Sequence, residues 1–208
     1  MNSKFISFEG IDGSGKTTQI RLLEKKLSKV GENVIVLREP GGTFISEKIR
    51  SILLDKENVE LSNEAECLLF FASRSQLVKE KIISELNKGS FIICDRFNDS
   101  TIAYQGYGFD MHVETLEAIS DFATFSMQPD LTFYLDISTK VSLDRRKMID
   151  SDRIESKGSE YLEKVRQGFL SISDKYPNRI ITIDASLSEQ KINEIIWLTI
   201  KEKYDIKN

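Results

Sequence analysis

The stretch from Gly10 to Thr17 matches the phosphate-binding pattern G-x-x-x-x-G-K-[ST]. In such a loop, glycines let the backbone approach phosphate groups, and backbone N–H groups gather around the anion. The loop works between a buried strand and the N-terminus of a helix. Residues 4–10 are typical of a strand, and residues 16–30 carry apolar side chains at helical spacing. The sequence therefore predicts a strand–loop–helix unit that binds phosphate.

Each loop residue has an expected role. Lys16 is predicted to bridge the outer phosphates, and Thr17 to hold Mg²⁺. Asp12 is unexpected, because a carboxylate among phosphates should be repelled, and one interpretation is that it caps the loop's own amides. The residues expected to bind ATP are Gly10, Asp12, Gly13, Ser14, Gly15, Lys16, Thr17 and Thr18.

Four further apolar runs, at residues 33–39, 91–96, 131–137 and 179–186, are typical of strands and alternate with helical patterns. Strands that alternate with helices indicate an α/β fold in which helices flank a parallel sheet. The sequence predicts five such strands in a single domain over residues 1–208. Ligands of such sheets bind at the carboxyl ends of the strands.

Composition narrows the possible partners. The chain has 208 residues and a formal net charge of −4, so neither nucleic acid nor a membrane is an expected partner. No apolar run reaches the roughly 18 residues of a membrane span, and no signal peptide is expected ahead of the first strand. Cys67 and Cys94 lie in apolar surroundings and are predicted to be buried thiols of a reducing compartment. These features predict a cytoplasmic protein.

The residues after the third predicted strand combine an acid with a base. Asp95 ends the strand, where an acid near Mg²⁺ is usual, and Arg96 follows it. A fixed arginine at that position suits a second phosphate group. The structural alternative is an Arg–Asp pair at the strand end.

Residues 67–76 are predicted to open a long helix. Phe70 and Arg74 are four residues apart and share a face, so one could stack on a base while the other donates hydrogen bonds. The alternative is ordinary packing beside a solvated arginine. The core stripe of this helix is expected to contain Leu68, Phe71, Ser75, Val78 and Ile82.

Two other segments carry arginines. Arg50 lies on the helix expected after the sharp turn Pro40-Gly41-Gly42. The alternative to a functional role is that Arg50 is an ordinary surface arginine. Residues 143–156, called the lid below, are dense in charge with little apolar periodicity. The lid arginines that could close over transferring phosphates are Arg145, Arg146 and Arg153, and the alternative is a solvated charge run.

Taken together, "FEGIDGSGKTT", "REPGGT", "DRFNDSTIAYQG" and "DRIE", in this order, resemble the thymidylate kinases of the bacterial type. The resemblance spans nearly the whole chain. It implies the P-loop NTPase fold with a short lid, and a kinase that uses ATP and Mg²⁺ to phosphorylate thymidine monophosphate (dTMP), a step that supplies dTTP for DNA replication. It also implies a homodimer formed through helices, including the one that bears Phe70 and Arg74.

The same resemblance implies residue roles. Phe70 stacks on thymine, Arg74 bonds its carbonyl edge, and Tyr104 lies against the deoxyribose. Arg50 and Arg96 hold the acceptor phosphate. The dTMP-binding residues are then Asp12, Arg50, Phe70, Arg74, Arg96, Ser100, Thr101, Tyr104 and Gln105.

The resemblance also addresses the loop acid and catalysis. It implies that Asp12 accepts a hydrogen bond from the sugar 3′-hydroxyl and contacts the basic residues near the acceptor phosphate. Lys16, Arg96, Asp12 and a lid arginine form the expected catalytic set. Arg153 is the preferred lid arginine, with Arg145 and Arg146 as alternatives.

Two other functions remain open at this point. A partner-binding switch ATPase or GTPase shares the phosphate loop, but the Asn-Lys-x-Asp pattern of guanine-specific switches is missing, because Ser90 ends the nearest match, "NKGS". A kinase for another nucleotide is the second alternative.

Overall fold

Five strands form one all-parallel sheet in the order β2-β3-β1-β4-β5. The computed structural model describes residues 4–146, 153 and 157–206, apart from the side chain of Arg146. The α/β fold and the five predicted strands are confirmed, with ends that shift by one or two residues. The strands are β1 (Phe5–Glu9), β2 (Val34–Arg38), β3 (Phe91–Asp95), β4 (Leu131–Asp136) and β5 (Ile180–Asp184).

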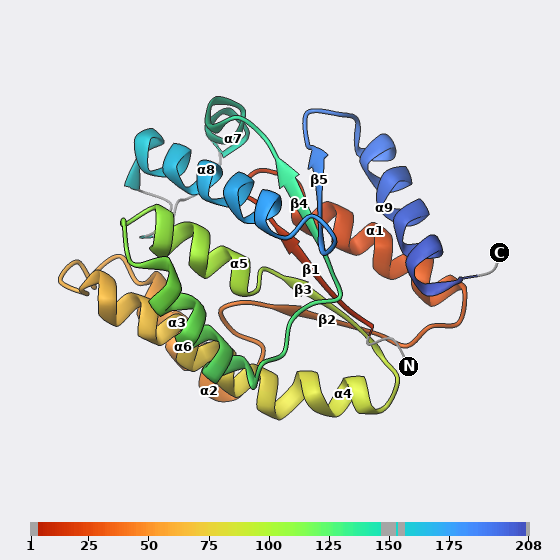
Figure 1. Cartoon of the computed structure of the whole chain (residues 1–208), viewed down its shortest axis with the longest axis horizontal. Coiled ribbons are helices and arrows are strands. Elements are labelled where there is room, and N and C mark those ends of the chain that lie inside the picture. The colour runs from red at the N-terminus through yellow and green to blue at the C-terminus, as the bar shows by residue number, and fades with distance from the viewer. Residues whose placement is uncertain (1–3, 147–152, 154–156, 207–208) are drawn as a thin grey trace.

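Helices cover both faces of this sheet (Figure 1). α1 and α9 lie side by side on one face, and α8 packs on the segment η2 across the other. The helices are α1 (Lys16–Lys29), α2 (Phe44–Leu54), α3 (Asn63–Leu77), η1 (Val78–Ile82), α4 (Ile83–Asn87), α5 (Asn98–Thr101), η2 (Ile102–Tyr107), α6 (Val113–Thr124), α7 (Thr139–Arg146), α8 (Ser159–Lys175) and α9 (Glu189–Tyr204). η1 and η2 are π-helical.

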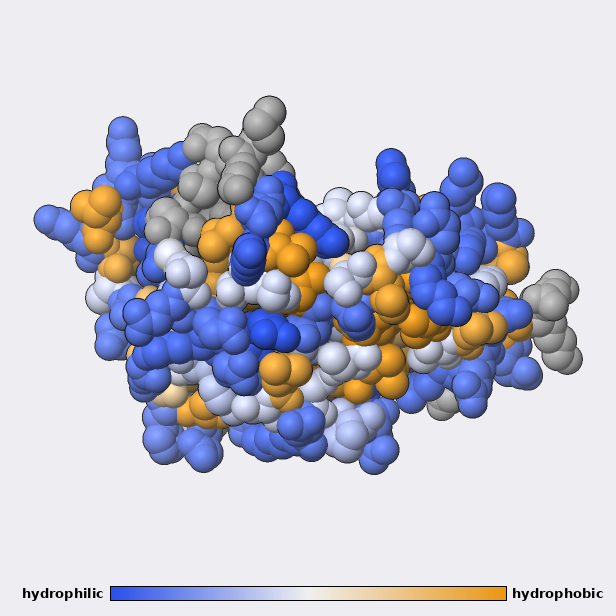
Figure 2. Space-filling view, turned by 90° about the horizontal axis from the view of Figure 1, so that it is seen from above, coloured by the Kyte–Doolittle hydropathy of each residue, from blue (hydrophilic) through white to orange (hydrophobic). Residues whose placement is uncertain are grey.

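The three central strands β1, β3 and β4 are buried nearly throughout, as apolar runs between two helical layers require, whereas the edge strands β2 and β5 are partly exposed. Ile6 and Phe8 of β1 join the larger core cluster with Leu23 of α1, whereas Phe5 joins a second cluster with Phe97. Cys67 and Cys94 are buried and free, as predicted. No helix within the described ranges is both long and apolar enough to pass through a bilayer. The face seen in Figure 2 is largely hydrophilic with smaller apolar groups between.

The helix that carries Phe70 begins earlier than predicted. α3 starts at Asn63, where the Ser62 side chain accepts a hydrogen bond from Ala65 N and caps the helix. Phe71, Val78 and Ile82 of the expected core stripe are buried, but Leu68 is 56% exposed. Arg74, by contrast, is only 1% exposed. The prediction that Leu68 belongs to the core stripe is therefore wrong. A polar contact network, described below, turns Arg74 inward.

The sheet register brings the polar strand ends together. Phe8 of β1 pairs with Asp95 of β3, and Arg38 of β2 also pairs with Asp95. Because the strands are parallel, the segments that follow them all emerge at one edge of the sheet. This edge carries the phosphate loop, Arg96 and the turn after β2.

Candidate functional site

The phosphate loop between β1 and α1 depends on three glycines with unusual backbone angles. Gly10, Gly13 and Gly15 have φ angles of 136°, 79° and 93°, in the left-handed region that favours glycine. A Cβ on Gly10 would lie 2.6 Å from Leu135 O, so only glycine fits there. The loop ends at the N-terminus of α1, whose partial positive charge favours an anion.

Lys16 lies inside this loop and is only 6% exposed. Its Nζ donates to Gly10 O at 2.9 Å and Ile11 O at 3.2 Å, and lies 3.9 Å from Asp12 Oδ1. Burial, followed by the charge of Arg96, lowers the pKa of Lys16. Phosphate oxygens accept stronger hydrogen bonds than these carbonyl groups, so the ammonium group is held ready for a bound phosphate.

Thr17 and Asp95 form an oxygen pair beside the loop. The Thr17 hydroxyl donates to Asp95 Oδ2 at 3.1 Å. Among the described residues, no group of three or more His, Cys, Asp or Glu side chains could hold a metal on its own. One hydroxyl and one carboxylate suit Mg²⁺, which usually takes its remaining ligands from phosphates and water. The pair fits the predicted metal site.

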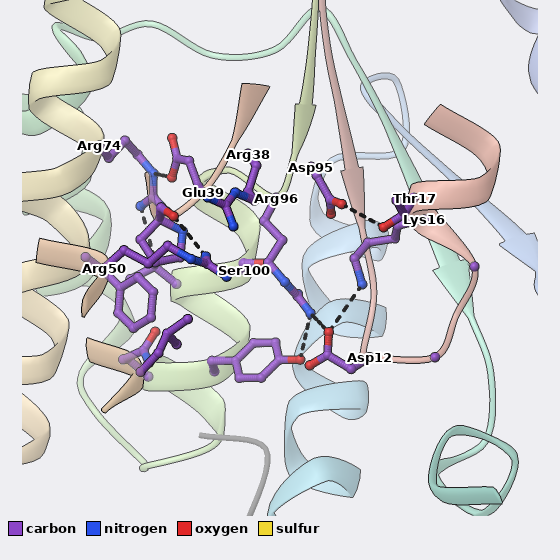
Figure 3. Close-up of a pocket in the computed structure, with 18 of the residues that line it drawn as sticks. Asp12, Lys16, Thr17, Arg38, Glu39, Arg50, Arg74, Asp95, Arg96 and Ser100 are labelled. Carbon is purple, nitrogen blue, oxygen red and sulfur yellow. Dashed lines mark hydrogen bonds and ion pairs between the residues drawn. The ribbon is translucent and has the colours of Figure 1, made fainter. Parts of the chain in front are cut away.

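Arg96 connects the phosphate loop with the neighbouring cavity (Figure 3). Its guanidinium donates to Asp12 Oδ1 at 2.7 Å, Gly10 O at 2.9 Å, Ser100 Oγ at 3.1 Å and Tyr104 OH at 3.3 Å. It therefore pairs with Asp12 rather than with its neighbour in the sequence, Asp95. Arg96 also has a φ of 71°, an uncommon value for a non-glycine residue that is found at functional sites.

One cavity of about 480 Å³ joins the loop to the helices on its far side. Its volume suits a small-molecule ligand. All residues predicted to bind dTMP line this cavity, together with Gly13, Gly15, Lys16, Thr17, Thr18 and Asp95. Two predicted ATP-binding residues do not line it. These are Gly10, whose carbonyl accepts from Lys16, and Ser14, whose hydroxyl is buried.

Arg74 is held by four protein groups. Its Nε donates to Glu39 Oε2 at 2.6 Å, and Nη1 donates to Asn98 Oδ1 at 3.1 Å and Thr101 Oγ1 at 2.9 Å. Its Nη2 donates to Phe97 O at 3.0 Å. An arginine has five N–H groups, so one hydrogen on Nη2 remains for a ligand. The alternative of a solvated Arg74 is wrong.

Phe70 lies half-buried on α3 and lines the same cavity as Arg74. The two side chains thus provide an aromatic face and a rigid donor, which together can hold a flat base. Arg50 also lines the cavity, and its Nη1 donates to Pro40 O at 2.9 Å. Arg50 is thus partly buried at the wall of the cavity.

Several acids of the site were not predicted from the sequence. Glu9 is buried and accepts from Phe97 N at 2.8 Å and Ser100 Oγ at 2.5 Å. Burial, followed by the charge of Asp99, raises its pKa to about 7. Burial likewise raises the pKa of Glu39 to about 7, although Arg74 opposes the shift.

Two of these acids could have been identified in the sequence, because they stand at the ends of predicted strands. Glu9 is the last residue of β1, and Arg38 and Glu39 stand at the end of β2. Arg38 and Glu39 both line the cavity. Glu66 was also missed, although it lies four residues before Phe70 and eight before Arg74, on one helical face.

The lid arginines lie at different places. Arg145 of α7 donates to Gly13 O at 2.9 Å and to Ala185 O at 3.2 Å, and so lies against the phosphate loop. Arg153 donates to Leu53 O at 3.1 Å and to Glu66 Oε2 at 2.6 Å, away from that loop. The side chain of Arg146 and most of the lid lie outside the described residues.

Comparisons with known proteins agree with this site. The family model described as thymidylate kinase matches residues 8–196. A thymidylate kinase of Caldanaerobacter subterraneus is 44% identical over 97% of each chain, and one of Thermosipho africanus is 49% identical over 88% of this chain and 90% of that protein. The crystal structure of thymidylate kinase from Ehrlichia chaffeensis has a TM-score of 0.79 and 33% identity, covering 97% of this chain and 100% of that one.

The agreement extends well beyond the phosphate loop, which many unrelated proteins share. It covers the strand ends, the cavity and the helix that bears Phe70 and Arg74. It also excludes the switch ATPase or GTPase as the class of this protein. Since the matched region contains every element that builds the site, the chain belongs to the thymidylate kinase family.

Proposed function

We propose that this enzyme transfers the γ-phosphoryl group of ATP to dTMP, with the ATP phosphates in the loop and dTMP in the adjoining cavity. The observation that carries the assignment is that Lys16 and Thr17 line the same cavity as Phe70 and Arg74. A phosphate donor and a base-bearing acceptor can therefore meet within one cavity. The product, thymidine diphosphate, supplies dTTP synthesis.

The proposed mechanism rests on positioning and charge. Arg50 and Arg96 hold the acceptor phosphate, and Arg38 adds positive charge at the same edge of the cavity. One oxygen of that phosphate attacks the γ-phosphorus in line. The attacking group is already an anion, so no strong general base is needed. Asp12 keeps the Arg96 guanidinium in place through the 2.7 Å ion pair.

Magnesium is the proposed cofactor, and Thr17 and Asp95 would hold it. When bound, it neutralises charge on the donor phosphates. Lys16 would serve the same purpose, because its ammonium group lies inside the loop. The Thr17–Asp95 hydrogen bond supports this assignment, because it already brings a hydroxyl and a carboxylate oxygen within 3.1 Å of each other.

A turnover assay with ATP and a panel of nucleoside monophosphates tests the proposal. dTMP should be the best acceptor, deoxyuridine monophosphate should be modestly weaker, and purine monophosphates should be nearly inert. The thymine methyl group contributes roughly 1 kcal/mol, which accounts for the modest difference from uracil. Equal use of several unrelated monophosphates would favour the alternative of a broader nucleotide kinase.

Asp12→Ala is expected to impair acceptor use much more than ATP binding. Its carboxylate is proposed to accept from the 3′-hydroxyl of dTMP while it orients Arg96, and charge-assisted hydrogen bonds contribute about 1.5–3 kcal/mol each. kcat/KM for dTMP should fall at least about tenfold. The wild type should use 3′-deoxy dTMP poorly, whereas the variant should barely distinguish it from dTMP. A loss of ATP affinity alone would show that Asp12 only structures the loop.

The roles of Arg145 and Arg153 can be separated by kinetics. Arg153 stays the proposed catalytic arginine only if it leaves Glu66 when the lid closes, whereas Arg145 already contacts the loop. An arginine that meets charge in the transition state lowers kcat more than it raises KM when replaced by alanine. Steady-state kinetics of Arg145→Ala and Arg153→Ala should show which variant behaves this way. An unchanged kcat in Arg153→Ala would transfer the role to Arg145 or Arg146.

We also propose a homodimer formed through α2, α3 and α6, which pack side by side. These helices expose apolar side chains, of which Phe44 is 75%, Leu68 56% and Phe122 85% exposed. Exposed groups of this kind mark interaction surfaces. Sedimentation should give twice the chain mass for the wild type, and Phe122→Lys with Leu68→Lys should give monomers. A wild-type monomer at micromolar concentration would contradict the proposal.

The remaining assignments follow from the sequence. We propose that residues 1–208 form a single domain, that the enzyme is cytoplasmic, and that it acts without nucleic acid or membrane partners. The net charge of −4 supports the absence of a polyanionic partner.

A further inference from the structure

We propose that Glu66 is a positioning residue for base recognition. It holds the Gln105 amide with its carbonyl oxygen toward the bound pyrimidine, and it links this orientation to Arg153 and Lys157. The inference rests on the proposed function, because Gln105 lines the cavity assigned to dTMP. It adds a second determinant of thymine preference to the donor supplied by Arg74.

Glu66 is a buried carboxylate whose partners come from three parts of the chain. It is 0% exposed on α3. Its Oε1 accepts from Gln105 Nε2 at 2.8 Å, and its Oε2 accepts from Arg153 Nη2 at 2.6 Å and lies 3.7 Å from Lys157 Nζ. A buried carboxylate needs such compensation, because an unpaired one is very costly. Two cations and one amide provide it here.

The carboxylate determines which way the Gln105 amide points. An ionised carboxylate only accepts hydrogen bonds, so the amide must turn its NH₂ group to Glu66. The carbonyl oxygen then lies on the opposite side of the amide. Within the described part of the chain, no group donates to Gln105 Oε1, and Gln105 lines the cavity. Glu66 therefore leaves an acceptor available to a ligand.

An acceptor at this position discriminates between pyrimidines. N3 of thymine and uracil carries a hydrogen and donates, whereas N3 of cytosine accepts. A fixed carbonyl oxygen therefore matches thymine and faces cytosine acceptor to acceptor. A site that is built to bond one group rejects the analogue that lacks it, because a buried polar atom is left without a partner.

The hydrogen bond between Glu66 and Gln105 lies where α3, η2 and the residues before α8 meet. η2, which carries Tyr104 and Gln105, is held to α8 by the Tyr161 hydroxyl, which donates to Tyr104 O at 3.1 Å. Lys157, just before α8, lies 4.0 Å from the centre of the Phe109 ring that follows η2. π-helical segments such as η2 occur frequently at functional sites. Glu66 thus connects the residues after the lid with the element that contacts the base.

The test compares kcat/KM for dTMP and deoxycytidine monophosphate in the wild type and in Glu66→Gln. The variant keeps the size of the side chain but gains a donor, so the Gln105 amide can flip and offer its NH₂ group to cytosine. The dTMP preference should fall at least about tenfold, mostly through better use of the cytosine acceptor. Glu64→Gln, at an exposed position on the same helix, is the matched control and should keep the wild-type preference.

A role limited to structure would give a different result. It would lower kcat/KM for both acceptors by the same factor and leave their ratio unchanged, and this outcome would overturn the proposal. In the Gln105→Leu background, Glu66→Gln should have no further effect on the ratio, because Glu66 acts through Gln105. A further change in that background would also contradict it.

Two further results distinguish a failure of folding, or of the proposed function, from a failure of the positioning role. If Glu66→Gln does not fold, the exchange variant Glu66→Gln with Gln105→Glu keeps one amide and one carboxylate in the contact and still presents an acceptor to the base. It should fold and prefer dTMP, and a loss of preference would overturn the positioning role. If the wild type does not phosphorylate dTMP at all, the proposed function fails instead.

Discussion

Replacing Lys16 with alanine is expected to reduce phosphoryl transfer by at least about a hundredfold. Its ammonium group would bridge the outer phosphates of ATP, where negative charge develops during transfer, and removal of one donor at such a point costs about 10²–10³ in kcat. The measurement is single-turnover transfer to dTMP at saturating ATP. Lys25→Ala is the matched control, because Lys25 is exposed on the same helix. A folded Lys16→Ala variant that keeps more than about a tenth of wild-type activity would remove the loop from the mechanism.

The fold of this variant should survive. Without ligand, Lys16 donates to Gly10 O and Ile11 O, so it has internal partners as well as its expected phosphate contacts. Losing these bonds should lower the free energy of unfolding by about 1–3 kcal/mol. Urea unfolding followed by circular dichroism measures this cost and separates it from the loss of activity.

Arg74→Ala is expected to lower the free energy of unfolding by about 3–5 kcal/mol, because it leaves the buried Glu39 carboxylate without its partner. Arg74 is 1% and Glu39 4% exposed, and their ion pair measures 2.6 Å. The variant should also lose much of its dTMP preference, since the remaining Nη2 hydrogen is the proposed donor to thymine. Urea unfolding of both proteins measures the difference.

The cost of Arg74→Ala should depend on pH. Burial raises the pKa of Glu39 to about 7 and Arg74 opposes the shift, so the pKa should rise further in the variant. The native variant then binds a proton that the unfolded chain releases above its ordinary pKa of 4.5. The wild type binds the same proton below about pH 7, so the two proteins diverge only above that value. The stability of the variant must therefore fall, relative to the wild type, as the pH rises from about 7 to 8.

A second variant isolates the buried charge. Arg74→Ala combined with Glu39→Gln removes both ionised groups and should recover part of the stability at pH 8 but little at pH 5, where Glu39 of the single variant is already protonated. An equal cost of Arg74→Ala at both pH values would show that lost hydrogen bonds to Asn98, Thr101 and Phe97 account for the effect.

Local patterns were sufficient for the scaffold, for the phosphate loop and for Asp95 beside it. The run 4–10 and the helical spacing in 16–30 predict β1 and α1 because burial in a sheet and on one helical face leaves different periods in the sequence. The phosphate loop could also be read directly, since its glycines serve the backbone of the loop itself. Asp95 was identifiable because it ends an apolar strand, and strand ends of a parallel sheet share one edge.

The part of the cavity around Phe70 and Arg74 could be predicted only in part. Phe70 and Arg74 share a helical face, so the sequence shows that they can act together, but it does not show that Arg74 is buried. That depends on Glu39 after β2 and on Asn98 after β3, which the fold brings to α3. The position of Leu68 is likewise not determined by the sequence. Its helical spacing predicts a place in the core, but an apolar residue at that spacing can equally face solvent or a second chain.

The sequence by itself determined the family of folds, the phosphate loop and the residue types that surround the cavity, because these depend on local periodicity and on fixed spacing along the chain. Only the tertiary structure decided the partners of the buried and partly buried charges. Asp12 with Arg96, Glu39 with Arg74 and Glu66 with Arg153 are separated by 84, 35 and 87 residues. Each pair forms because a charge taken out of water must find compensation, and the available partner is whichever group the packed helices and strands bring within reach.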